Sequence, residues 1–117
     1  MSGTRASRFS ALVVTAASLC GSAPSLASFR DGNALLQQCT ATIGAEMDFC
    51  YGYIDAITDY LLVNNVIGEF AACITTDLDD SRVRDLVVKF LRDNPRLRRR
   101  GASGLIAQAL SERFPCQ

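Results

Sequence analysis

Hydrophobic residues recur at helical spacing in four successive segments that follow residue 30. The clearest stripe consists of Val83, Leu86, Val87, Phe90 and Leu91, which repeat at the spacing of one face of an amphipathic helix. The pattern predicts helices over about residues 33–43, 47–66, 81–94 and 99–113. No segment alternates clearly enough to predict a strand.

Boundary residues support these four helices. Asp31 or Asn33 can cap the first helix, and Asp80 or Ser81 can cap the third, because their side chains accept hydrogen bonds from free backbone N–H groups. Gly44 is a typical residue to stop the first helix. Four helices joined by short links predict an all-α fold, a small four-helix up-down domain.

The first 27 residues have the order of a secretory signal peptide. Arg5 and Arg8 precede an apolar run over residues 9–19, and small residues then lead to Ala27. The run is shorter than the about 20 residues that span a bilayer. We therefore expect a cleaved signal over residues 1–27, a domain over 28–117 and no stable membrane anchor. An uncleaved anchor and lipid attachment at Cys20 are the less favoured alternatives.

Four cysteines follow the predicted cleavage point: Cys39, Cys50, Cys73 and Cys116. An even number in a small exported chain indicates two disulfides, and a domain of 90 residues needs such cross-links because its core is small. Four free thiols are the alternative. The chain has no histidine and no closely spaced cysteine pair, which argues against a zinc site.

Helix geometry favours the pairs Cys39–Cys50 and Cys73–Cys116. The first pair flanks one turn between helices, and the second pair meets if the third and fourth helices are antiparallel. Cys50–Cys73 is disfavoured because the second helix separates its ends by roughly 27 Å, whereas bonded cysteines have Cα atoms within about 7 Å. Residues 67–73 could extend back by about 23 Å, so this alternative pairing stays open.

Charge is unevenly distributed along the chain. Residues 31–80 hold nine acids and no base, whereas residues 82–113 hold nine bases and three acids. The predicted mature chain has a net charge of −2, which argues against a nucleic-acid partner. The asymmetry marks either a partner surface or two halves that neutralise each other.

Two charged clusters are candidates for binding a partner. They are Asp77, Asp79 and Asp80 before the third helix, and Arg96, Arg98, Arg99 and Arg100 before the fourth. The acidic cluster suits a basic partner, and the alternative is helix capping. The arginine cluster suits an acidic protein or anionic lipid, and the alternative is a solvated loop.

Catalytic machinery is not recognisable. Without histidine, a Ser-His-Asp or Cys-His arrangement cannot form, and no phosphate-binding glycine loop or metal-ligand cluster is present in the sequence. Asp55 and Asp59 share a helix face near Tyr51, Tyr53 and Tyr60, so acid–base catalysis is an alternative to a solvated face. We expect neither an enzyme nor a cofactor.

Several short motifs follow one another in a familiar order. They are Asp31-Gly-Asn-Ala-Leu-Leu-Gln-Gln-Cys39, Cys50-Tyr-Gly-Tyr-Ile-Asp-Ala-Ile-Thr-Asp59, Val87-Val-Lys-Phe-Leu91 with Asn94-Pro95, and Phe114-Pro115-Cys116. With this order the chain resembles the Rap/Tai family of periplasmic immunity proteins, over nearly all of the predicted mature chain.

The resemblance implies a small helical, often dimeric, protein in the periplasm of a Gram-negative bacterium. Characterised relatives bind peptidoglycan amidases delivered by type VI secretion and block their clefts. By similarity, the four cysteines and Gly52, Tyr53, Asp59 and Pro115 match family positions, which we interpret as fold positions. Ala56 and the proline-free segment after Cys73 depart from the family pattern. A periplasmic binding or acid-stress chaperone-like module without a toxin partner is the main alternative function.

Overall fold

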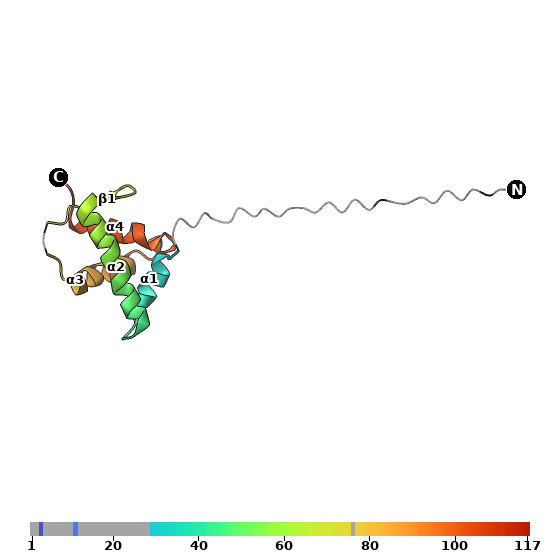
Figure 1. The fold of residues 1–117 in the computed structure, drawn as a ribbon, viewed down its shortest axis with the longest axis horizontal. Coiled ribbons are helices and arrows are strands. Elements are labelled where there is room, and N and C mark those ends of the chain that lie inside the picture. The colour runs from blue at the N-terminus through green and yellow to red at the C-terminus, as the bar shows by residue number, and fades with distance from the viewer. Residues whose placement is uncertain (1–2, 4–10, 12–28, 76) are drawn as a thin grey trace.

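A computed structural model describes residues 3, 11, 29–75 and 77–117 (Figure 1). The predicted signal peptide lies outside the described residues, apart from Gly3 and Ala11. The helices are α1 (Gly32–Cys39), α2 (Ala45–Asn64), α3 (Asp80–Asp93), the short 3₁₀ helix η1 (Leu97–Arg99) and α4 (Ala102–Arg113). The prediction of a small helical domain with two disulfides is thereby confirmed.

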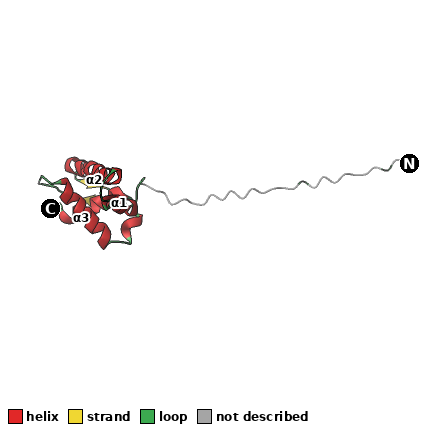
Figure 2. Ribbon diagram, turned by 90° about the horizontal axis from the view of Figure 1, so that it is seen from below, coloured by secondary structure: helices red, strands yellow, loops and turns green. Residues whose placement is uncertain are grey.

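A short β-hairpin follows α2, so the expectation of no strand is wrong. Strand β1 (Val66–Ile67) pairs antiparallel with β2 (Phe70–Ala71) (Figure 2). Asn65 ends α2 with a left-handed backbone (φ 61°), and Gly68 turns the hairpin with φ 59°. Strands of two residues are too short to show the period-2 alternation that identifies a strand in a sequence.

The first helix ends earlier than predicted. It stops at Cys39, and the Thr40 hydroxyl donates a hydrogen bond to the Leu36 carbonyl at 2.7 Å. Ile43, the last residue of the predicted helix, lies instead in the turn that follows and is 88% exposed. Gly44 has φ +100° and serves as the N-cap of α2 rather than as the stop of α1.

Capping also differs between the helices. Asp31 caps α1 as predicted, since its carboxylate accepts a hydrogen bond from the Ala34 N–H at 2.8 Å. The N-cap of α3 is Asp79 rather than Asp80 or Ser81. The fourth helix begins at Ala102 instead of residue 99, because the chain first forms the 3₁₀ turn η1.

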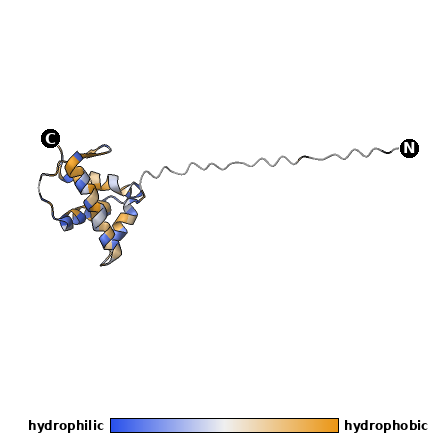
Figure 3. Cartoon of the chain, in the orientation of Figure 1, coloured by the Kyte–Doolittle hydropathy of each residue, from blue (hydrophilic) through white to orange (hydrophobic). Residues whose placement is uncertain are grey.

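The core is aliphatic and draws on all four helices. Leu35, Ile54, Leu91, Ile106 and Leu110 are fully buried. Each such side chain contributes about 1.5–3 kcal/mol through burial before entropy is counted. Figure 3 shows hydrophobic residues at the end of α2 next to the hairpin, some of them exposed. No helix in the described part of the chain is both long and apolar enough to cross a membrane.

The α1 start approaches other backbone very closely. A Cβ at Gly32 would lie 2.5 Å from Leu105 Cδ1 and 2.9 Å from Arg98 Cα. The Gly32 N–H donates a hydrogen bond to the Arg100 carbonyl at 3.1 Å, and the Ala102 N–H donates to the Arg30 carbonyl at 2.9 Å. Glycine at position 32 therefore lets α1 dock directly on η1 and α4.

The two disulfides lie in different surroundings. Cys39 and Cys50, whose Cα atoms are 5.0 Å apart, join the end of α1 to the first turns of α2 inside the core. Cys73 and Cys116, 4.9 Å apart, join the segment after the hairpin to the chain end at the surface. These are the pairs that helix geometry favours.

Candidate functional site

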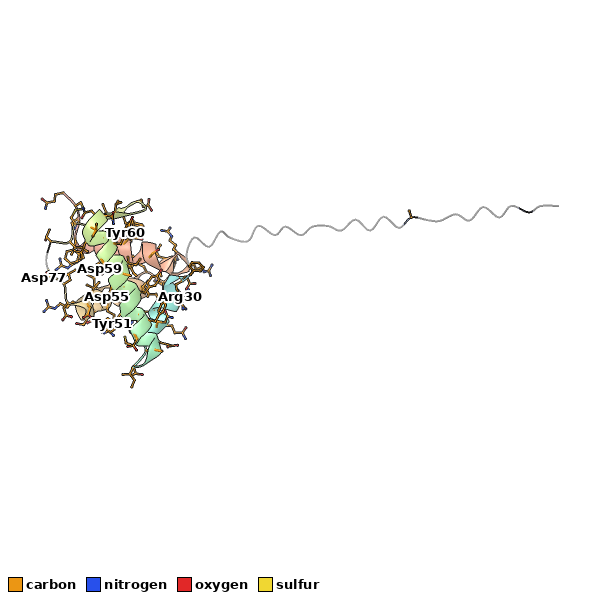
Figure 4. All side chains as sticks on the ribbon, in the orientation of Figure 1. Arg30, Tyr51, Asp55, Asp59, Tyr60 and Asp77 are labelled. Atoms are coloured by element: carbon orange, nitrogen blue, oxygen red, sulfur yellow. A yellow bond between two sulfur atoms is a disulfide. The ribbon has the colours of Figure 1, made fainter. Side chains whose placement is uncertain are left out.

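A groove lined by four carboxylates lies between α2 and the start of α3. Asp55 and Asp59 come from adjacent turns of α2, and Asp77 comes from the loop before α3 (Figure 4). Asp80 is the first residue of α3. The cavity measures about 350 Å³. We call it the acidic groove; it is also lined by Thr58, Leu62, Ile74, Leu78 and Val83.

Negative charge in the acidic groove is not neutralised within the described residues. The two ion pairs in the described part of the chain are Arg84–Asp85 and Lys89–Asp93. Both lie within α3, and neither involves a carboxylate of the groove. Burial raises the pKa of Asp55, and the negative charges of Asp80 and Asp59 raise it further. The surroundings of Asp55 therefore disfavour the ionised form of its side chain.

The predicted acidic cluster divides into two roles. Asp79 accepts a hydrogen bond from the Ser81 N–H at 3.1 Å as the cap of α3. That backbone hydrogen bond is the main reason why the pKa of Asp79 lies below its usual value, with Asp80, the Ser81 side chain and Arg82 contributing. Asp77 and Asp80 instead join the acidic groove.

A second cavity adjoins the acidic groove and shares Asp77, Leu78 and Val83 with it. It measures about 590 Å³ and includes Asp77, Asp79, Arg82, Arg113 and Phe114 among its lining residues. Here acidic and basic side chains are mixed. Arg82 and Arg113 thus line this second cavity and do not line the acidic groove.

The arginine cluster lies apart from the acidic groove. Arg98 is half-buried in η1 beside the start of α1, whereas Arg96, Arg99 and Arg100 are exposed. None of the four forms an ion pair with an acid in the described residues. The acidic and basic halves of the chain therefore do not neutralise each other through direct ion pairs there.

The three tyrosines that are near Asp55 and Asp59 in the sequence lie outside the acidic groove. The Arg84 guanidinium lies over the Tyr51 ring, with its Cζ atom 6.0 Å from the ring centroid. Tyr53 stacks on Phe49 with ring centroids 5.7 Å apart, and Tyr60 is 52% exposed. The acidic groove contains no tyrosine among its described lining residues, so a tyrosine-lined catalytic pocket does not form.

Two of the motif residues have unexpected surroundings. Gly52 is exposed on α2, and a Cβ there would meet nothing within 4 Å. Asp59 lines the acidic groove. Pro115, by contrast, forms a β-bridge with Ala72 beside the surface disulfide. The sequence placed Asp55 and Asp59 on one face, but only the docking of α3 brings Asp77 and Asp80 to them.

The described residues include no group of three or more side chains arranged to hold a metal ion.

A family model described as Rap1a immunity proteins matches residues 31–116. The chain belongs to the Rap1a immunity protein family. Membership in this Rap1a family makes a protein toxin the expected partner. Neither the curated proteins nor the solved structures gave a match to the chain.

Proposed function

We propose that this Rap1a family member is exported to the periplasm and there binds and occludes a peptidoglycan amidase delivered by type VI secretion. The family match over residues 31–116 carries the proposal. The two disulfides support it, because such bonds persist in oxidising compartments such as the bacterial periplasm. Export would remove residues 1–27 and leave Ser28 as the first residue.

The proposed mode of action is occlusion. A rigid body of four helices with two cross-links loses little conformational entropy on binding. The proposed contact surface is the segment with Asp77 and Asp80, and the arginine cluster of Arg96, Arg98, Arg99 and Arg100 is the second candidate. Asp79, which caps α3, contributes by fixing the start of that helix.

Inhibition of purified type VI amidases tests this function. The oxidised mature chain, added in equal amount to each enzyme of a panel, should abolish cleavage of purified peptidoglycan by its cognate amidase. A reduced and alkylated sample is the matched control and should not inhibit. If the oxidised protein leaves every amidase active but prevents aggregation of unfolded proteins at about pH 2 to 3, the chaperone-like alternative replaces the proposal.

We also propose a homodimer formed through the exposed end of α2. Val63 is 80% exposed, Tyr60 is 52% exposed, and Val66, which follows the helix, is 45% exposed. Exposed apolar patches of this kind typically mark interfaces. Sedimentation equilibrium should give a dimer that dissociates in a Val63→Glu variant but persists in the matched variant Glu69→Gln.

A further inference from the structure

The 3₁₀ helix η1 directs its side chains to two sides. Leu97 packs against the core, and Arg98 is half-buried with its Nε atom shielded from solvent. Arg96 and Arg99 are exposed instead, and Arg96 begins the turn with helical backbone angles (φ −71°, ψ −26°). Side chains three residues apart eclipse one another on a 3₁₀ turn. The Arg96 and Arg99 guanidinium groups therefore share the outer side of η1.

Residues 29–32 lie beside this turn. The hydrogen bonds from Gly32 to Arg100 and from Ala102 to Arg30 hold them alongside residues 96–101. Phe29 is fully exposed there, and Arg100 is exposed as well. An aromatic side chain and three arginines are thus brought to one side of the molecule. We call this surface the arginine face; it consists of Phe29, Arg96, Arg99 and Arg100.

The arginine face carries charge that the described residues leave without an ion pair. The two acids nearest to it along the chain are engaged elsewhere, because Asp31 caps α1 and Asp93 pairs with Lys89. Asp77, from the acidic groove, lies on the opposite side of the domain from Arg30 (Figure 4). The domain therefore presents opposite charges on opposite sides.

We propose that the arginine face binds the anionic phospholipid surface of a membrane. The guanidinium groups lie among the lipid phosphates, and the Phe29 ring enters the boundary between headgroups and acyl chains, which aromatic and basic side chains favour together. Adsorption to such a plane needs charges on one face and does not need them to converge on one point. The inference rests only on the export part of the proposed function, and it leaves the segment with Asp77 and Asp80 accessible to a toxin.

The place where the chain enters the domain supports a membrane as the partner. Residues 20–28 separate Phe29 from the apolar run of the predicted signal peptide. Nine residues reach at most about 30 Å when extended. While the signal is attached, the arginine face would therefore lie close to the membrane that holds the signal.

Other partners use less of this surface. The carboxylates of peptidoglycan, or of an acidic protein, would pair with the arginines but offer no apolar layer for Phe29. A second copy of this chain would normally form an isologous dimer, which sets arginine against arginine, and like charges facing each other oppose association. The proposal therefore commits to lipid and makes the other partners outcomes of the test.

Vesicle cosedimentation tests the proposal with the oxidised chain of residues 28–117, which lacks the apolar run that could insert by itself. We expect binding to vesicles of phosphatidylglycerol and phosphatidylcholine in equal parts, and at least tenfold weaker binding to phosphatidylcholine alone. Added salt should weaken binding to the mixed vesicles, because it screens exposed charges. Failure to bind the mixed vesicles, or equal binding to both kinds, would overturn the proposal.

Matched variants distinguish the arginine face from overall charge. Arg96→Gln with Arg99→Gln should weaken binding to the mixed vesicles at least tenfold. Arg82→Gln with Arg113→Gln removes the same charge from exposed side chains beside the second cavity and should leave binding nearly unchanged. Phe29→Ser should weaken binding about threefold without altering its salt dependence. Equal losses in the two double variants, or no loss in Phe29→Ser, would contradict the proposal.

Two measurements identify the competing partners. Retention on purified peptidoglycan that depends on Arg96 and Arg99, without binding to vesicles, would assign the surface to the cell wall in place of lipid. A dimer in sedimentation velocity that only the Arg96 and Arg99 double variant dissociates would assign it to a second copy. Either result overturns the proposal.

An inhibition assay separates this inference from the proposed function. In solution without lipid, the Arg96 and Arg99 double variant should inhibit the cognate amidase as strongly as the unchanged protein. Loss of inhibition would make these arginines a toxin contact and overturn the membrane role. If the unchanged protein inhibits no amidase, the immunity function falls, and the vesicle measurements still decide the membrane role. Thermal melts confirm that each variant is folded.

Discussion

The two disulfides mark two regions of the molecule that differ in how deeply the cysteines are buried. We call α1 together with Cys39–Cys50 the packed end: both cysteines are buried, and at its other end α1 docks on η1 and α4 with no room for a Cβ at Gly32, although a cavity of about 400 Å³ borders Cys39. Around Cys73–Cys116, which we call the grooved end, Cys116 is exposed. The loop between Cys73 and α3 borders two cavities there.

The difference indicates a division of labour. The packed end supplies stability, because its side chains and backbone are in close contact. In such a dense core, any gap removes the contacts of the atoms that line it. The grooved end keeps polar groups accessible to a partner, and its surface disulfide limits the motion of the loop that carries Asp77. Both ends are stapled, but only the first staple is also part of the core.

The largest expected effect is that of removing the buried disulfide. Cys39→Ala with Cys50→Ala should lower the free energy of unfolding by about 5 kcal/mol. Of this, about 3 kcal/mol comes from the cross-link, which spans 11 residues. About 2 kcal/mol comes from the loss of two buried sulfur atoms. Urea unfolding monitored by circular dichroism measures the change.

Removal of the surface disulfide should cost somewhat less. Cys73→Ala with Cys116→Ala removes a cross-link spanning 43 residues, worth about 4 kcal/mol on the chain-entropy model, with little packing lost at the exposed Cys116. In the unchanged protein, graded reduction followed by alkylation and mass spectrometry should open Cys73–Cys116 first. If the surface pair proved the costlier one to remove, loop length rather than burial would govern, and the comparison between the two ends would fail.

One substitution placed in two environments sharpens the comparison. Gly32→Ala should destabilise the protein by about 1–3 kcal/mol, because the added Cβ would overlap Leu105 and the Arg98 backbone. Gly52→Ala is the control, since a Cβ there meets open space. It should stabilise α2 by about 0.5–1 kcal/mol. Equal melting temperatures for the two variants would show that the packed end tolerates added volume.

The four helices could be predicted from the sequence because burial repeats with the helical period. Leu35, Ile54, Val87 and Leu110 lie where the apolar stripes place them. The ends of the helices were harder to predict. Ile43 continues the apolar stripe of α1 in the sequence, but in the structure it lies exposed in the turn after that helix. The hairpin strands have two residues each and carry no period.

The groove and the packed end depend on contacts between distant parts of the chain. Asp55 and Asp59 were recognisable as neighbours on a helix, but their approach to Asp77 and Asp80 depends on how α3 docks against α2. Similarly, Gly32 follows the capping residue Asp31, and nothing in the neighbouring sequence indicates that this position requires glycine. Its close neighbours Arg98 and Leu105 come from the other end of the sequence.

The smallest expected effect concerns the charge of the grooved end. Because burial, Asp80 and Asp59 raise the pKa of Asp55 in the folded state, its ionisation destabilises the fold at neutral pH. This penalty disappears as the pH falls below the ordinary aspartate value of about 3.9. Asp55→Asn should therefore stabilise the protein at pH 7 by about 0.2–0.5 kcal/mol, the usual size of a like-charge effect between adjacent helical turns.

The pH dependence distinguishes this relief of burial and repulsion of the Asp55 charge from a general effect of the substitution. In urea unfolding, the gain from Asp55→Asn should be present at pH 7 and absent at about pH 3, where the carboxyl group is protonated. Asp48→Asn is the matched control on the same helix. Its carboxylate lies in the first turn of α2, where negative charge stabilises the helix, so its loss should cost about 0.3–1 kcal/mol. A loss of stability at pH 7 from Asp55→Asn as well would mean that the groove carboxylates support the fold, and the grooved end would then be built for stability like the packed end.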